Sequence, residues 1–110
     1  MKVLIDENLP LKLKRLFGDD HEVLSAREMG WQGKKNGELL GLMTLDGFEA
    51  LVTMDKSLPN QQNLGKFPLS IFILRGVNNK FETLQALVPL ILERIENGVD
   101  SGVIEIENSQ

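Results

Sequence analysis

Short apolar runs alternate with helix-like segments along this chain of 110 residues, and this alternation constrains the fold more than any other feature. Runs centred on 3–5, 22–24, 50–52 and 70–74 are rich in Val, Ile and Leu and are short. Such runs are typical of strands in a parallel sheet that is covered on both faces. Residues 102–107 alternate apolar and polar side chains, which predicts an edge strand with one face toward solvent.

The segments between these runs have the spacing of helices. Residues 9–17 place Leu and Phe side chains on one side, with Asn8 expected as the N-cap. A second helix is expected to begin with Asn36 as its cap, and a long one to cover 81–95 with a kink at Pro89 and a stop at Gly98. Residues 59–68 are polar and are expected to be a loop. The order strand–helix–strand–helix–strand–loop–strand–helix–strand predicts an α/β fold with a mostly parallel, doubly wound sheet of five strands.

Composition limits the classes of function. The length fits one domain spanning 1–110, and a hydrophobic content of 42 % is ordinary for a globular protein. The chain has no cysteine, which excludes disulfides and thiolate sites. No apolar run is long enough to span a membrane, so we expect a soluble, cytoplasmic protein. The net charge of −4 argues against a strongly basic nucleic-acid module, but not against an enzyme that meets phosphates through a bound metal.

Acidic residues stand where the predicted fold would bring them together. Asp6 follows the first strand, with Glu7 beside it, and Asp55 comes shortly after the third. Glu38 lies near the start of the second helix. In open α/β sheets, sites form beyond the carboxyl ends of the strands, so three carboxylates there would suit Mg²⁺ or Mn²⁺. Capping of turns and helix ends is an equally good use for each of them.

Four segments together resemble the PIN-like domains, in particular the short stand-alone kind that is often paired with a small antitoxin protein. These segments are VLIDENLP, HEVLSAREMGWQG, NGELL and ALVTMDKSL, and they cover residues 1–58 in order and spacing. The rest of the chain is similar in layout only. The resemblance implies a three-layer α/β/α fold and a metal-dependent ribonuclease, the toxin component of a toxin–antitoxin pair.

The resemblance also implies roles for individual residues. Asp6, Glu38 and Asp55 match the positions that hold Mg²⁺ or Mn²⁺ in the family. The accessory positions that we expect around them are Glu7, Asn8, Asn36, Lys56 and Ser57. The chain departs from the family at two places, because Asn36 and Ser57 stand where further acids are common. Less charge at the site implies weaker metal binding and puts the activity in doubt.

Two alternatives remain open. A PIN-like domain that has lost catalysis would be a protein-binding module, with Trp31 as a candidate contact, although a Trp that covers the core is the more ordinary interpretation. A receiver-type phosphoacceptor domain would also have acids after the first strand and an Asp after the third, but no Lys follows a late strand here. The partners expected are RNA, a small antitoxin protein and, through the C-terminal helix, a second copy of the chain.

Overall fold

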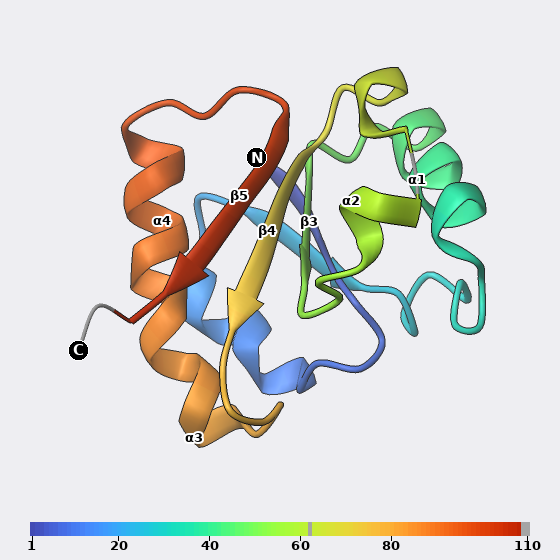
Figure 1. The fold of residues 1–110 in the computed structure, drawn as a ribbon. Coiled ribbons are helices and arrows are strands. Elements are labelled where there is room, and N and C mark those ends of the chain that lie inside the picture. The colour runs from blue at the N-terminus through green and yellow to red at the C-terminus, as the bar shows by residue number, and fades with distance from the viewer. Residues whose placement is uncertain (62, 109–110) are drawn as a thin grey trace.

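A computed structural model describes residues 1–61 and 63–108 and contains one five-stranded sheet (Figure 1). The strands are β1 (Lys2–Ile5), β2 (Glu22–Ser25), β3 (Ala50–Thr53), β4 (Ser70–Arg75) and β5 (Gly102–Glu107). All pairings are parallel and the order is β2-β1-β3-β4-β5. The predicted α/β class with a parallel sheet is confirmed.

The helices lie on both faces of the sheet and make three layers. One face carries the 3₁₀ helix η1 (Leu11–Phe17), α3 (Phe81–Leu84), the 3₁₀ turn η3 (Gln85–Leu87) and α4 (Val88–Glu96). The other carries α1 (Asn36–Leu45), α2 (Leu58–Gln61) and the 3₁₀ turn η2 (Leu64–Lys66). In Figure 1, α4 and α1 accordingly stand on opposite sides of the strands.

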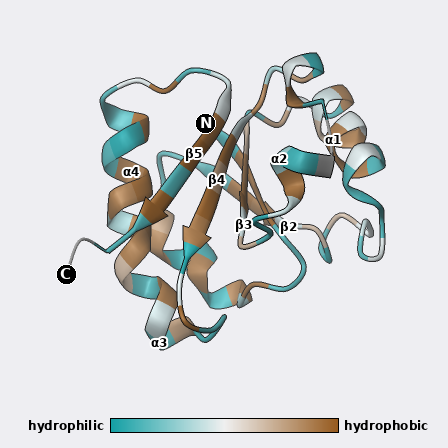
Figure 2. Ribbon diagram, in the orientation of Figure 1, coloured by the Kyte–Doolittle hydropathy of each residue, from teal (hydrophilic) through white to brown (hydrophobic). Residues whose placement is uncertain are grey.

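Alternate side chains of the strands supply the two halves of the core. Ile5, Val52 and Phe72 face α4 and η1, whereas Leu4, Leu51 and Ile71 face α1. All six are at most 2 % exposed. Because both faces are covered, the central strands β3 and β4 are nearly continuous apolar runs and appear mainly brown in Figure 2, whereas β5 is banded. At the edge, β5 buries Ile106 and exposes Val103, as its alternation predicted.

The helices differ from the sequence expectation in detail. The first is a 3₁₀ helix that begins at Leu11, because the Leu9 N–H is already bonded to the Asp6 carbonyl in the preceding turn. Asn8 is therefore not its cap. The cap position is Pro10, and no side chain caps this end. Asn36 is likewise not a cap but the first residue of α1, which follows Lys35.

The second half of the chain holds two further corrections. The expected loop 59–68 contains α2 and η2, whose Leu58 and Leu64 pack against the core beside α1. The expected long helix is divided by η3, ahead of Pro89, which lies in the first turn of α4 where a missing N–H costs little. Gly98 ends α4 with a φ of 89°, as expected.

Over the described residues, none of the helices has the length and apolar character needed to cross a membrane.

Candidate functional site

Asp6 and Asp55 meet at the carboxyl edge of the sheet, because β1 and β3 are neighbours in parallel register. Asp6 directly follows β1, and its N–H continues the ladder by bonding to the Val52 carbonyl at 3.0 Å. Thr53, the last residue of β3, links the two aspartates. Its hydroxyl donates to Asp6 Oδ2 at 2.7 Å and accepts from the Asp55 N–H at 3.1 Å. The predicted convergence of these two acids is confirmed.

The Asp6 carboxylate is half-buried and has two described hydrogen-bond donors. Besides Thr53, the Glu7 N–H donates to Oδ1 at 2.8 Å. Burial raises the pKa of Asp6 above its ordinary value, and the negative charges of Glu7 and Asp55 add to this, while the two hydrogen bonds oppose it. The ionised form of Asp6 is therefore disfavoured in the folded protein, and a nearby positive charge would stabilise it.

The Asp55 carboxylate lies in a more open and better-solvated position. Ser57 donates to Oδ1 through its N–H at 2.9 Å and through its hydroxyl, and Asn36 Nδ2 donates to Oδ2 at 3.1 Å. The bond from Ser57 lowers the pKa of Asp55, burial partly opposes this, and the bond from Asn36 lowers it further. Both residues that replace expected acids thus serve as donors that keep Asp55 ionised.

Glu38 does not join this pair. It lies in the first turn of α1 with an exposed side chain, and its Oε2 is 3.8 Å from Lys34 Nζ, one turn earlier. Across 1–61 and 63–108, no three Asp, Glu or His side chains are grouped so as to hold one ion. The structure therefore brings two of the three predicted ligands together. The third, Glu38, pairs instead with Lys34, which lies in the loop just before α1.

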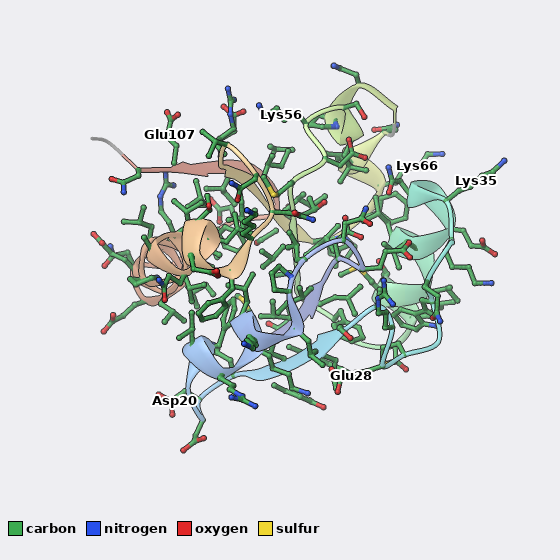
Figure 3. The ribbon with its side chains drawn as sticks, turned by 90° about the horizontal axis from the view of Figure 1, so that it is seen from below. Asp20, Glu28, Lys35, Lys56, Lys66 and Glu107 are labelled. Atoms are coloured by element: carbon green, nitrogen blue, oxygen red, sulfur yellow. The ribbon has the colours of Figure 1, made fainter. Side chains whose placement is uncertain are left out.

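The other predicted accessory residues have separate places. Glu7 Oε1 accepts the Gly33 N–H at 2.9 Å, so this carboxylate fastens the loop 26–35 to the end of β1. Asn8 is exposed, and its carbonyl accepts the Asn79 amide at 2.9 Å. Lys56 is exposed beside Asp55 and extends outward in Figure 3, which views the molecule from the edge where β4 and β5 end.

A cavity of about 360 Å³ opens at this edge over the two aspartates. Beside Asp6 and Asp55 it is lined by residues from four loops and from α1, chief among them Asn8, Trp31, Asn36 and Asn79. A second cavity, of about 470 Å³, shares Asp6 and Asn79 and extends toward Arg27 and Glu28 beside β2. The two cavities therefore adjoin at Asp6 and Asn79.

Three residues of the site were not assigned to it from the sequence. Thr53, the last residue of β3, was given no role from the sequence, although a hydroxyl at the end of an otherwise apolar run is a usable signal. Asn79 follows β4 and reaches Asn8 across 71 positions, which no local pattern indicates. Trp31 was considered as a protein contact or, more ordinarily, as a cover of the core. The structure packs it against the core and also places it in the wall of the cavity.

Comparison of the chain with protein-family models, with curated proteins and with solved structures finds no match. The chemistry of the site therefore rests on its geometry. Two adjacent carboxylates, each held by donors and each with a lone pair to spare, can bind a hydrated divalent cation. The strand order agrees with this location, since β1 and β3 flank the point at which the chain reverses its winding.

Proposed function

We propose that this protein is a ribonuclease of the PIN-like type, which hydrolyses phosphodiester bonds of RNA with Mg²⁺ or Mn²⁺ held by Asp6 and Asp55. The observation that carries the proposal is the junction of these two carboxylates through Thr53. Its position at the reversal point of a parallel sheet is where ligands bind in this class of fold.

The donor set fits a single hard cation. Mg²⁺ keeps several waters and is commonly bound by one or two carboxylates together with substrate phosphates. The raised pKa of Asp6 supports this fit, because a cation would offset the burial and the repulsion that disfavour its charge. When bound, the metal supplies an activated water and neutralises charge on the scissile phosphate.

The residues of the chain would orient the site before the substrate arrives. Thr53 fixes Asp6, and Ser57 and Asn36 fix Asp55, so neither carboxylate has to be ordered on binding. Lys34, whose side chain is partly exposed in the wall of the cavity, offers a positive charge to a phosphate. Glu38 shares that lysine and would moderate its charge without contacting the metal.

The biological setting is part of the same proposal and rests on the resemblance alone. A toxin of a toxin–antitoxin pair would have a small protein partner that blocks the cavity, and a second copy of the chain is the other partner considered. If the site binds no metal, the same surface would act as a protein-binding module.

Cleavage of short unstructured RNA, with Mg²⁺ or Mn²⁺ and with EDTA, tests the proposal. We expect Asp6→Asn and Asp55→Asn each to lower kcat by about 100-fold or more, since each removes a ligand charge that acts in the transition state. Glu38→Gln is the matched control, and we expect less than about a 5-fold change. Equal activity of wild type and Asp6→Asn, or activity in EDTA, would sink the proposal.

A receiver-type phosphoacceptor is the second candidate, because the order β2-β1-β3-β4-β5 is also the order of those domains. Its requirement for a basic residue at the site is poorly met, since Arg75 at the end of β4 is paired with Glu105 at 2.6 Å. Treatment with acetyl phosphate separates the two. A phosphoryl mass shift on Asp55 would favour the receiver, and no shift is expected.

A further inference from the structure

We propose that Trp31 is a stacking platform for a nucleobase next to the scissile phosphate. The inference rests on the proposed function and assigns a subsite to it. Trp31 lines the same cavity of about 360 Å³ as Asp6 and Asp55. The volume lies within the range of roughly 300–1,000 Å³ that is usual for small-ligand sites.

The indole is held rigidly from behind. Its ring meets the Phe48 ring edge-to-face, with centroids 5.8 Å apart and an interplanar angle of 64°. The backbone N–H of Trp31 donates to the Ala26 carbonyl at 2.9 Å, and the Glu7 carboxylate accepts a hydrogen bond from the backbone N–H of Gly33, two residues further on. A ring fixed in this way loses little entropy when a base stacks on it.

Part of Trp31 is accessible from the cavity. Trp31 is half-buried, and its indole N–H makes no hydrogen bond with the residues the structure describes. Among those residues the sole buried side-chain polar atom without a partner is Nδ1 of His21, so the indole N–H is in contact with solvent. Because it lines the cavity and is not fully buried, Trp31 can offer part of its ring to a ligand there.

The charges of the cavity wall favour binding of a nucleobase over binding of a further phosphate group beside Trp31. The wall carries the acids Asp6, Glu7 and Asp55 against the single cation Lys34. Phosphate binding would therefore need the metal, whereas a neutral ring needs an aromatic face and polar edges.

Two carboxamides supply those polar edges. Asn8 and Asn79 both line the cavity and both are exposed. Asn79 uses its Nδ2 to bond the Asn8 carbonyl, and its carboxamide oxygen makes no bond with the described residues. Amide groups of this kind hydrogen-bond the edges of unpaired bases. An unpaired nucleotide can thus place its base on Trp31 and its phosphate near the aspartates.

The fluorescence of Trp31 tests the subsite directly, since the chain has one Trp and no Tyr. The wild-type protein is titrated with AMP and with UMP, and separately with ribose 5-phosphate, which has the sugar and phosphate but no base. We expect saturable quenching and reduced access of acrylamide with the nucleotides, and no change with ribose 5-phosphate. Equal responses to all three ligands, or no response to any, would overturn the stacking role.

Substitutions give a second readout. We expect Trp31→Leu to raise KM for RNA by about 5- to 100-fold with a smaller effect on kcat, and Trp31→Phe, which keeps a flat ring, to raise it only about 2- to 5-fold. Circular dichroism and Tm check that both variants are folded. If Trp31→Leu proves unfolded, the comparison of Trp31→Phe with wild type and the titration still decide the question.

The two proposals can fail separately. Monophosphates contain no diester bond, so quenching by them is independent of cleavage. Cleavage with an unchanged fluorescence would keep the ribonuclease and reject the subsite. Quenching without cleavage would keep the subsite and reject the ribonuclease.

Discussion

Replacing Thr53 with Val tests how the two aspartates are held together. Thr53 is 1 % exposed, so its hydroxyl is shielded from solvent. Val has nearly the same shape, and the change therefore removes two hydrogen bonds without opening a cavity. The bonds lost are the donation to Asp6 at 2.7 Å and the acceptance from the Asp55 N–H at 3.1 Å.

The loss of stability in Thr53→Val can be worked out from these two hydrogen bonds. A hydrogen bond to a charged group contributes about 1.5–3 kcal/mol, and a neutral one about 0.5–1.5 kcal/mol. We therefore expect Thr53→Val to lower the free energy of unfolding by about 2–4 kcal/mol at pH 7. For a domain of this size each kcal/mol moves Tm by about 4 °C, so Tm should fall by roughly 8–16 °C.

The cost should depend on pH in a defined direction. The Thr53 bond favours the ionised form of Asp6 and lowers a pKa that burial has raised, so its loss raises that pKa further. A carboxyl with a raised pKa in the folded state destabilises the fold as pH rises from the unfolded value of about 3.9 through the folded pKa. Asp6 has a higher pKa in the folded variant than in the folded wild type, so the variant loses more stability as pH rises. Its deficit should therefore be larger at pH 7 than at pH 4.

Urea unfolding of both proteins at pH 4 and pH 7 measures this difference. Thr44→Val is the matched control, because the Thr44 hydroxyl donates to the uncharged Leu40 carbonyl within α1, at 2.8 Å. We expect it to cost less than about 1 kcal/mol and to be independent of pH. A cost for Thr53→Val below about 0.5 kcal/mol, or equal costs at the two pH values, would refute the assignment of these bonds.

Three further predictions concern stability and use the same unfolding assay. Gly98→Ala should cost about 1–2 kcal/mol, because Gly98 has a φ of 89°; no measurable loss would contradict the left-handed cap. Pro89→Ala should change stability by less than about 1 kcal/mol, since Pro89 lies in the first turn of α4, whereas a large gain would indicate a strained kink. Glu28→Gln should cost less than about 1 kcal/mol at pH 7. A hydrogen bond from Lys14 lowers the pKa of Glu28, so its contribution is present at neutral pH and fades as pH falls through that pKa; a cost unchanged down to pH 3 would contradict the pairing.

The sheet and the pairing of Asp6 with Asp55 could be predicted because both depend on short-range patterns. Runs such as 50–52 and 70–74 are buried on both faces, so their composition alone marks them as strands. Once strands one and three are taken as neighbours, residues just beyond them must share an edge. The register of Ile5 with Val52 confirms that step.

Side-chain direction could not be predicted in the same way. Glu38 was placed on the correct helix, but its carboxylate lies near Lys34. Whether Glu38 meets this lysine or the two aspartates depends on the angle of α1 to the sheet. Asn is a residue type that favours helix caps, yet the Asn36 amide bonds the Asp55 carboxylate, 19 positions away in the sequence. Contacts of this range are set by how the layers pack, which local propensity does not contain.

The predicted helix boundaries were wrong for a related reason. The stretch 59–68 was expected to be a loop, but Leu58 just before it is buried in the core and Leu64 within it packs against the same cluster. These two leucines anchor short helices in a stretch that is otherwise polar. Residues 81–95 have one apolar stripe, but their backbone tightens into η3 before Pro89 while Leu84, Leu87 and Val88 remain buried. Periodicity detects the stripe and not the change of helix type, because both helix types present side chains about three residues apart.

The two aspartates are inequivalent although they share one threonine, and this difference bears on function. Asp55 has donors on both carboxylate oxygens from Ser57 and Asn36 and needs no further positive charge to remain ionised. Asp6 is desolvated and repelled by its neighbours, so its charge is the one that a cation would stabilise. Local stability is commonly given up at functional sites. Under the proposed function, Asp6 is the carboxylate whose charge a bound cation would stabilise more, because Asn36 and Ser57 already donate hydrogen bonds to Asp55.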